Sequence, residues 1–289
     1  MLLNSFKLYT PTTLAEALNL YSSLEDARLL AGGTFLLNSL KLLKEKGVKT
    51  PQHIISLRKI KDLRGISVEG DDLVIKSMTV INDIFNYPGL KDNFEVLHKV
   101  CRNISTNPIR NMATIGGNLT SRYTWTELGC VLIALDAKMH FVGKDQIEEC
   151  ISVEDFFANG AKTNKILKAI SIKKDGQCKL SYQRVKKMSD VDVPLLAVCV
   201  KTTIAQGRFT KTKAVINSGI IFAKRDSILE NFLNNSNLNH QVSQDALNNL
   251  DASIYDTRSD DYKKHMFRVS IKNAILELMG EERNDSQHK

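Results

Sequence analysis

The sequence predicts a mixed α+β fold in three parts, because three patterns follow one another along the chain. Near the amino terminus an apolar run, a glycine pair, a helical stripe and a second apolar run are typical of a strand–helix–strand unit. From residue 64 apolar and polar residues alternate, as in antiparallel strands, and after residue 176 three longer alternating runs precede helices. We therefore expect an α/β subdomain at 1–57, a second at 58–174, and a C-terminal α+β domain at 177–280 with a three-stranded antiparallel sheet.

The first subdomain is expected to hold two helices and two parallel strands. Thr13 and Glu16 have the spacing of a capping box, which predicts the start of a helix, and Gly47 is a natural stop for the second helix. The expected elements are a helix over about 13–23, a strand Arg28–Ala31, a helix with the apolar stripe Leu36, Leu37, Leu40 and Leu43, and a strand His53–Ser56.

The second subdomain is expected to begin with a hairpin, because Gly70-Asp71 separates two alternating runs. Ser152 has the position of a helix cap before a short apolar segment. The expected elements are strands Ile66–Val68, Leu73–Ser77, Lys138–Val142, Glu148–Ile151 and Ile166–Ile172, and helices over about 90–102 and 126–135.

A polar turn at Lys173-Lys-Asp-Gly176 is the expected boundary of the C-terminal domain. Beyond it we expect strands Lys179–Arg184, Val193–Thr203 and Lys213–Ile221, then two or three helices, the last over about 260–279. The polar residues 281–289 are expected to form a disordered tail.

Bulk properties narrow the function classes. The chain has no apolar stretch of the ~18 residues that a membrane span needs and no secretory signal at its start, so we expect a cytoplasmic protein that does not bind membranes. Five cysteines without a CxxC pair argue against a disulfide framework and against a zinc or iron–sulfur site on this chain. The net charge of +8 suits an acidic partner or an anionic cofactor, while no basic run with interleaved aromatic residues indicates nucleic acid.

Two glycine segments carry the chemistry. In Leu29-Leu-Ala-Gly-Gly-Thr34 and in Asn107–Asn118, which ends Thr-Ile-Gly-Gly-Asn, an apolar run that resembles a buried strand ends in a glycine pair beside Thr or Asn. Such a turn can expose main-chain N–H groups to phosphate oxygens, and two of them could hold the two phosphates of a dinucleotide. A glycine pair between a strand and a helix is also a common tight turn, so the first segment alone decides nothing. Neither segment has the spacing of a Rossmann or Walker motif.

Five stretches together resemble a known family. They are Ala31-Gly-Gly-Thr34, Ile109-Arg-Asn-Met-Ala-Thr-Ile-Gly-Gly-Asn118, Leu132-Ile-Ala-Leu-Asp-Ala137, Tyr182-Gln-Arg-Val-Lys-Lys187 and Asp256-Thr-Arg-Ser-Asp-Asp-Tyr-Lys-Lys264. In this order and spacing they resemble the FAD-binding medium subunit of the molybdenum hydroxylases, such as the xanthine, carbon monoxide and nicotinate dehydrogenases. The resemblance covers nearly the whole chain.

The resemblance implies a fold and a binding site. The fold would be the FAD-binding fold of the vanillyl-alcohol-oxidase (PCMH) type, in which two α/β subdomains clasp a noncovalently bound FAD and a C-terminal α+β domain follows. Main-chain amides of both glycine segments would bind the pyrophosphate, while Glu127 would lie near the flavin or ribityl chain and Leu167 against the ring system. The residues that the resemblance places at FAD are Leu30, Ala31, Gly32, Gly33, Thr34, Phe35, Ile109, Thr114, Ile115, Gly116, Gly117, Asn118, Glu127 and Leu167.

The resemblance also implies a function. The chain would be an FAD-dependent oxidoreductase subunit that receives electrons from a [2Fe–2S] partner subunit. That partner would in turn be fed by a molybdopterin subunit that hydroxylates a purine or another N-heterocycle. FAD would pass the electrons to NAD⁺ or another acceptor. The assembly would be a hetero-oligomer, such as a dimer of heterotrimers, and this chain would contribute no catalytic side chain and no metal ligand.

Two departures from the family pattern leave alternatives open. Phe35 stands where relatives usually have Asp, and Arg122-Tyr-Thr-Trp-Thr-Glu127 replaces a segment of small residues. Tyr123 and Trp125 could stack on the flavin, block an approach to it, or pack against a partner subunit. A second hypothesis is therefore a structural subunit of the same fold with impaired flavin chemistry. A third, a basic nucleic-acid-binding module, rests on the net charge alone.

Overall fold

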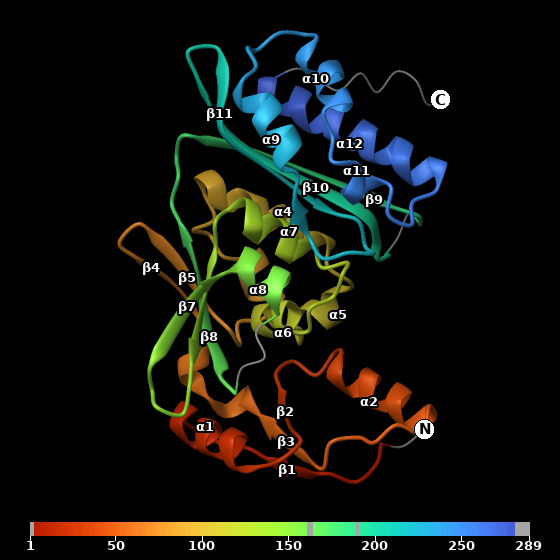
Figure 1. Cartoon of the computed structure of the whole chain (residues 1–289). Helices are drawn as coiled ribbons and strands as arrows, with labels where there is room; N and C mark the ends of the chain where they lie inside the picture. The colour runs from red at the N-terminus through yellow and green to blue at the C-terminus, as the bar shows by residue number, and fades with distance from the viewer. Residues whose placement is uncertain (1–2, 161–163, 189–190, 281–289) are drawn as a thin grey trace. The chain divides into compact units, whose positions relative to one another are not determined.

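The computed structural model describes residues 3–160, 164–188 and 191–280, which form two compact units (Figure 1). Unit 1 takes in the described residues up to Tyr87, together with Ser105–Ser121 and Ala137–Lys173. Unit 2 takes in Pro88–Ile104, Arg122–Asp136 and the described residues from Lys174 onward. The three-part division expected from the sequence stays a prediction, and the predicted tail 281–289 lies outside the described residues.

Unit 1 begins with a three-stranded parallel sheet in the order β1-β3-β2. Its elements are β1 (Lys7–Tyr9), α1 (Leu14–Ser23), β2 (Ala27–Leu30), α2 (Leu36–Glu45) and β3 (His53–Ser56). The predicted pair of parallel strands is confirmed, whereas no pattern predicts β1, because three residues carry no readable period. Thr13 caps α1 as predicted, since its hydroxyl accepts from the Glu16 N–H at 3.2 Å. The Glu16 carboxylate accepts a hydrogen bond from the N–H of Thr12, whereas in a capping box it would accept from the N–H of Thr13.

The second sheet of unit 1 has five antiparallel strands in the order β4-β5-β8-β6-β7. The strands are β4 (Ile66–Glu69), β5 (Asp72–Lys76), β6 (Lys138–Val142), β7 (Glu148–Ser152) and β8 (Ile166–Lys173). The helices of this part of the chain are α3 (Ile81–Phe85), α5 (Asn107–Arg110), α6 (Ile115–Thr120) and α8 (Val153–Asn159). The predicted hairpin and the predicted cap at Ser152, which accepts from the Asp155 N–H at 2.9 Å, are both confirmed.

The local structure of the second glycine segment differs from the prediction. The apolar run before it is not a strand, because Asn107–Arg110 forms the short helix α5. Gly116 and Gly117 do not form a turn either, since they lie in the first turn of α6 with Thr114 as the N-cap. The Thr114 hydroxyl accepts from the Gly117 N–H at 3.1 Å, which stabilises a helix start that two glycines would otherwise weaken.

Unit 2 is built on an antiparallel sheet of four strands, and the prediction of three was wrong. The order is β12-β11-β10-β9, with β9 (Cys178–Lys186), β10 (Pro194–Ala205), β11 (Arg208–Asn217) and β12 (Lys224–Arg225). β12 has only two residues, which is too short for an alternating pattern. β11 begins and ends earlier than predicted because Gln206 and Gly207, with φ of 50° and 71°, make a two-residue hairpin turn.

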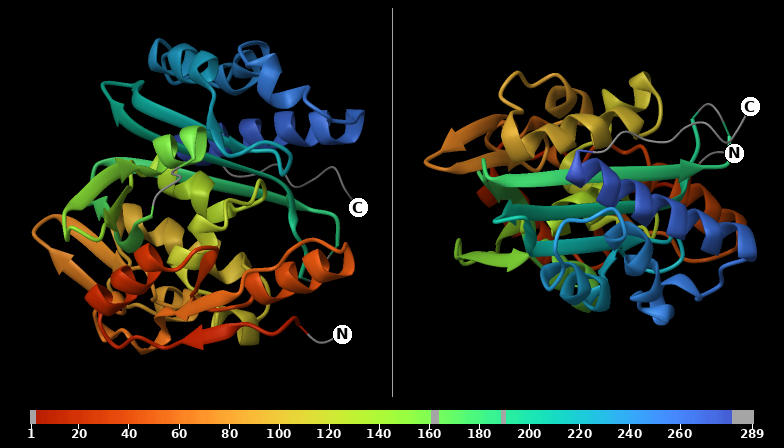
Figure 2. Two further views of the ribbon diagram at one scale, coloured as in Figure 1. Left: turned by 60° about the horizontal axis from the view of Figure 1, so that its bottom comes forward. Right: turned by 90° about the horizontal axis from the view of Figure 1, so that it is seen from above.

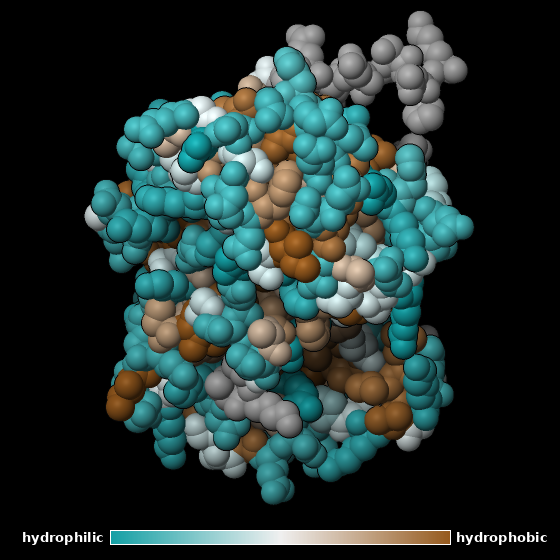
Figure 3. Space-filling view, turned by 45° about the horizontal axis from the view of Figure 1, so that its top comes forward, coloured by the Kyte–Doolittle hydropathy of each residue, from teal (hydrophilic) through white to brown (hydrophobic). Residues whose placement is uncertain are grey.

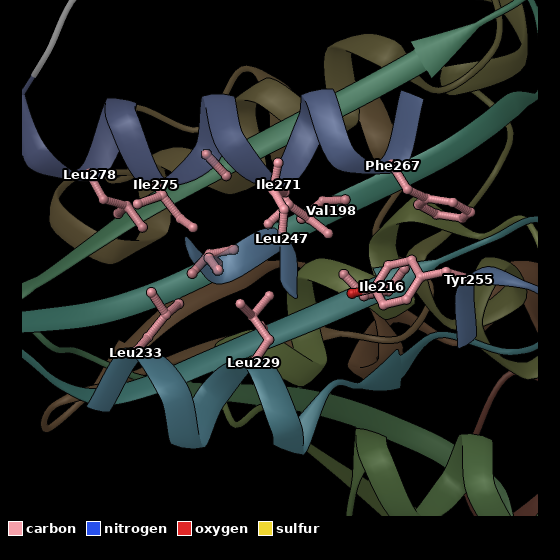
Figure 4. Close-up of a cluster of buried hydrophobic side chains, with 14 of the residues drawn as sticks. Val198, Ile216, Leu229, Leu233, Leu247, Tyr255, Phe267, Ile271, Ile275 and Leu278 are labelled. Carbon is pink, nitrogen blue, oxygen red and sulfur yellow. The ribbon is translucent and has the colours of Figure 1, made fainter. Parts of the chain in front are cut away.

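Helices cover both faces of this sheet. On one face lie α9 (Ser227–Asn234), α10 (Val242–Asp245) and α12 (Asp261–Met279), with α11 (Ala252–Tyr255) beside them. Their apolar side chains meet those of β10 and β11 in one cluster (Figure 4), and α12 lies over the sheet in the right-hand view of Figure 2, with contacts to β9 and β10. The other face packs against α7 (Glu127–Ala134), where the Cys130 thiol lies 3.3 Å from the Val215 carbonyl oxygen, and α4 (Glu95–Asn103) packs on α7.

The surface agrees with the composition. Polar residues dominate the face shown in Figure 3, with apolar residues in separate groups. Among the described residues, no helix has both the length and the apolar character needed to cross a membrane.

Candidate functional site

The two glycine segments lie against each other in unit 1. A Cβ built on Gly32 would come within 2.0 Å of the Met112 carbonyl oxygen, so only glycine permits this approach. A Cβ on Gly117 would come within 3.3 Å of the Ala31 Cβ. Residues about eighty positions apart are therefore brought together by main-chain contact, and glycine is required at the closest point.

A third stretch supports the second segment from behind. The N–H groups of Gly116 and Ile115 donate to the carbonyl oxygens of Ser77 and Thr79 at 2.9 and 3.0 Å. A Cβ on Gly116 would lie 2.7 Å from the Ser77 carbonyl oxygen, so the start of α6 sits directly on the chain that follows β5. The Ser77 hydroxyl is buried beside this contact with no hydrogen-bond partner in the described part of the chain.

The first segment presents unused hydrogen-bond donors. Within the described residues, the N–H groups of Gly32, Gly33 and Thr34 donate to no protein acceptor. Gly33 has a φ of 75°, a conformation that favours glycine, and α2 follows at once. The N-cap of α2 is Phe35, whose side chain makes no cap hydrogen bond, so no capping side chain occupies this end of the helix.

In the second segment, the N–H groups of residues 115–118 already donate to acceptors of this chain. Besides the two bonds to Ser77 and Thr79, the N–H of Gly117 donates to the Thr114 hydroxyl and that of Asn118 to the Thr114 carbonyl oxygen. Pyrophosphate binding by the amides of this segment stays a prediction. The structure shows that the second glycine segment packs against the first one, because Met112 contacts Gly32 and Gly117 contacts Ala31.

The other predicted residues of unit 1 lie in different environments. Leu30 is the last residue of β2 and Ile109 lies in α5 with 37% of its surface exposed. Leu167 is buried in β8, in register with Phe141 of β6. The predicted contact of Leu167 with the flavin ring system stays a prediction, since its position in the sheet does not test it.

Glu127 belongs to unit 2, where it is the first residue of α7 and is buried. Its carboxylate accepts hydrogen bonds from the Tyr182 hydroxyl and, at 2.7 Å, from the Arg184 Nε. Burial raises the pKa of the Glu127 carboxyl above its ordinary value, although the Arg184 charge acts in the opposite direction. Burial likewise raises the pKa of the Tyr182 hydroxyl well above its ordinary range. Glu127 thus ties α7 to β9, whatever else it contacts.

Three residues of the site take part through main-chain atoms, and only Met112 of the three lies in a stretch that the sequence singles out. Met112 takes part through its carbonyl oxygen, and Ser77 and Thr79 accept main-chain hydrogen bonds through theirs. Main-chain contacts do not depend on residue type, so no motif marks Ser77 or Thr79 and none assigns Met112 this contact. The only sequence trace is the pair of glycines that face them, Gly32 and Gly116.

Comparison with known proteins shows the family of the chain. Residues 4–173 match the family described as the FAD binding domain in molybdopterin dehydrogenase. The chain is 36% identical over 138 residues to the carbon monoxide dehydrogenase medium chain of Hydrogenophaga pseudoflava, which is 47% of this chain and 46% of that one. It is 27% identical over 172 residues to the nicotinate dehydrogenase FAD-subunit of Eubacterium barkeri, covering 59% of this chain and 57% of that one. The chain thus spans about half the length of the curated relatives that it matches.

Solved structures extend the likeness over nearly the whole chain. Carbon monoxide dehydrogenase from Hydrogenophaga pseudoflava superposes with a TM-score of 0.86 at 25% identity, covering 97% of this chain and 99% of that one. Quinoline 2-oxidoreductase from Pseudomonas putida 86 gives 0.85 at 19% identity, with the same coverage, which shows the shared fold.

Proposed function

This chain belongs to the family of FAD-binding domains of molybdopterin dehydrogenases, and from that premise we propose that it binds FAD noncovalently at the paired glycine segments of unit 1. The fold we propose is the vanillyl-alcohol-oxidase (PCMH) type, with the cofactor clasped by the subdomains of the two sheets. The observation that carries the proposal is the set of N–H groups at Gly32, Gly33 and Thr34, which have no acceptor in the described chain and stand in front of an uncapped helix.

The chemistry of this end of α2 suits a pyrophosphate. Main-chain N–H groups and the positive end of a helix dipole both stabilise a bound anion. The tight contact of Gly32 with Met112 fixes the N–H groups before the ligand arrives, so less ordering entropy is lost on binding. Neither glycine segment contains His or Cys, which supports noncovalent attachment.

The residues of this chain would hold and orient the cofactor rather than react. Gly32, Gly33 and Thr34 would bind phosphate oxygens, while Thr114 and Asn118 would be the polar side chains nearest to them on the second segment. Once bound, FAD supplies the two-electron and one-electron redox chemistry. No acid–base pair of this chain is needed for that.

We further propose that the chain relays electrons within a hetero-oligomer. An iron–sulfur subunit would deliver electrons from a molybdopterin subunit acting on a purine or another N-heterocycle, and NAD⁺ or another acceptor would take them up. The names of the relatives support a medium or FAD subunit of a larger enzyme. The net charge of +8 would favour the approach of an acidic partner.

The second candidate is a structural subunit of the same fold with impaired flavin chemistry. It is favoured by Phe35, which is 41% exposed at the N-cap of α2 where relatives usually carry Asp, and by the N–H groups of residues 115–118, which already donate to acceptors of this chain. In that case the chain would assemble with its partners but would hold little FAD.

One experiment separates the two. The chain, produced with its partner subunits, should show flavin absorbance, release FAD on denaturation, and be bleached by the substrate of the complex or by NADH. A complex that assembles without flavin would support the structural role. A complex that holds FAD which no partner and no NADH reduces would contradict the proposed relay.

A further inference from the structure

One side chain of α3 holds the second glycine segment. Asn82, in the first turn of α3, donates through its Nδ2 group to the Oδ1 atoms of Asn107 and Asn111, both at 2.7 Å. Its own Oδ1 accepts from the Arg110 Nε at 3.3 Å. The amide thus uses both of its N–H groups and its oxygen. All three partners lie in the short helix α5 or directly after it, at spacings that share one helix face.

The segment depends on such support because α5 is too short to be stable by itself. It has four residues, whereas an isolated helix needs ~12 or more. Its N-cap Thr106 makes no side-chain cap hydrogen bond. Ser105 before it has a φ of 46°, an uncommon conformation for serine, and the Arg110 Nη1 donates to its carbonyl oxygen at 2.9 Å. The contacts of Asn82 therefore stabilise this helical turn from outside the segment.

The contacts with α3 lie on both sides of Met112. Before it, Asn111 is bound by the Asn82 side chain. After it, the Ala113 carbonyl oxygen accepts from the Ile81 N–H at 2.9 Å. Since both neighbours are bound to consecutive residues of α3, the carbonyl group of Met112 has a fixed position relative to that helix.

The position of Met112 limits the first glycine segment. Its carbonyl oxygen is the atom that a Cβ on Gly32 would meet at 2.0 Å, and the Ala113 Cα would lie 3.0 Å from the same Cβ. A shift of Met112 therefore changes the space in which Gly32 and its N–H group are held. All of these residues belong to unit 1, as does Asn82.

We propose that Asn82 is a positioning residue of the FAD site. By fixing Met112, it keeps the N–H groups of residues 32–34 in the arrangement that receives the pyrophosphate. The proposal rests on the proposed function, in which FAD binds at these N–H groups. Donors that are already in place lose less entropy when a ligand binds. Loss of the Asn82 contacts therefore weakens FAD binding even in a chain that is still folded.

The test separates positioning from stability. The full chain is freed of FAD and titrated with FAD, at a temperature at which urea unfolding shows every variant to be fully folded in the absence of urea. Asn82→Leu keeps nearly the shape of the side chain but forms no hydrogen bond. We expect the dissociation constant of FAD to rise by about threefold to tenfold. A purely structural role would lower the midpoint of unfolding and leave the dissociation constant of the folded chain unchanged.

A conservative variant should restore binding. In Asn82→Asp the carboxylate can accept from Arg110 and, once the side-chain amides of Asn107 and Asn111 turn over, from their Nδ2 groups. An acidic residue in the first turn also suits the dipole of α3. The dissociation constant of FAD should return to within about twofold of the wild-type value.

The matched control is Asn234→Leu in unit 2. Asn234 is half-buried, as Asn82 is, and its Oδ1 accepts from the Thr212 N–H at 2.8 Å. The substitution removes a hydrogen bond and should lower the free energy of unfolding. It should leave the dissociation constant of FAD unchanged, because none of its contacts reaches the glycine segments.

A second variant covers the case in which Asn82→Leu does not fold. Asn107 and Asn111 are exposed, so the double substitution Asn107→Ala with Asn111→Ala should be tolerated. It removes both acceptors of the Asn82 Nδ2 group and should also raise the dissociation constant of FAD by about threefold or more.

The outcomes distinguish this proposal from the proposed function. A wild-type chain that binds no FAD would overturn the proposed function, and the positioning role with it. Equally tight binding by the wild type, Asn82→Leu and the double variant would overturn the positioning role alone. Equal weakening in Asn234→Leu, or a failure of Asn82→Asp to restore binding, would overturn it as well, since neither result is compatible with an effect of these hydrogen bonds on the site.

Discussion

At the scale of the residue, the site depends on main-chain positions that no larger side chain can take. Gly32 leaves no room for a Cβ beside Met112, and Gly33 has the left-handed conformation that presents its N–H group outward. The side chains around them matter less, because the proposed ligand contacts are main-chain N–H groups. The addition of a single methyl group at Gly32 should therefore have a large effect on stability and on ligand binding.

The substitution Gly32→Ala tests this directly. The new Cβ would overlap the Met112 carbonyl oxygen, so the two segments must separate, and we expect a loss of about 1–3 kcal/mol in the free energy of unfolding together with loss of bound FAD. FAD content by absorbance and unfolding in urea measure the two effects. Gly176→Ala is the matched control, since a Cβ there meets nothing within 4 Å. Full FAD occupancy in Gly32→Ala would contradict the proposed site.

The buried carboxyl of Glu127 makes a prediction about pH. Because burial raises its pKa in the folded state, the folded protein binds more protons than the unfolded chain at pH values between the two pKa values. Stability from this group is therefore present at low pH and is lost as pH rises from the ordinary glutamate pKa through the raised one. A glutamine side chain cannot ionise, so the melting temperature of Glu127→Gln relative to wild type should increase as pH rises from about 4.5 to 7. A constant difference over this range would refute the raised pKa.

At the scale of the element, turn geometry decides where strands begin. The β10–β11 hairpin turns at Gln206 and Gly207, and both residues have positive φ. Glycine accepts this conformation freely, whereas glutamine is strained there. The same choice of residue explains why the sequence does not reveal the turn, since Asn-Gly or Asp-Gly would have marked it.

Replacement of the strained residue should stabilise the hairpin. Gln206→Asn is expected to raise the free energy of unfolding by up to about 1 kcal/mol, because asparagine tolerates the left-handed conformation better than glutamine. Urea unfolding measures the gain. Gln244→Asn is the control, since Gln244 is an exposed residue of α10 and has no positive φ. A gain of equal size in the control would point to a cause other than turn strain.

The elements differ in how well the sequence predicts them. β3, β6 and β8 are predicted within a residue or two because their apolar residues are bounded by turns or polar segments. β12 and β1 escape prediction, since two or three residues acquire strand structure only through their neighbours. The predicted strand and turn of the second glycine segment were wrong, because Asn107–Arg110 is helical and Thr114 caps a helix that its own glycines disfavour. The glycines of the candidate site could be predicted because they lie in recognisable motifs. Their contacts with Met112 and Ser77 could not, because these two residues take part through main-chain atoms.

At the scale of the whole molecule, each of the two units has a hydrophobic cluster of its own among the described residues. The cluster in Figure 4 belongs to unit 2, while a second cluster around Leu18, Ile55 and Leu63 belongs to unit 1. The N–H groups of Gly32, Gly33 and Thr34 are all in unit 1. A ligand bound there stabilises the fold by mass action, in proportion to the logarithm of the ratio of its concentration to its dissociation constant.

FAD should therefore raise the thermal stability of the chain. At a hundredfold excess over the dissociation constant we expect an increase in melting temperature of about 5–10 °C. Scanning calorimetry with FAD, with AMP and without ligand measures the melting temperature. AMP lacks a pyrophosphate and should give a smaller increase. The Gly32→Ala chain should show no shift. An equal shift in that variant would place the binding site elsewhere.

The order in which unit 2 is assembled has a consequence for synthesis on the ribosome. α7 is buried along its whole length, and the strands that cover it, β10 and β11, are translated long after it. Until then this almost entirely apolar helix lacks its cover and can associate with other nascent chains. A fragment cut at residue 173, where the family match ends, would keep α7 in that state permanently. We expect such a fragment to aggregate, because the boundary of the family match separates α7 from the strands that cover it.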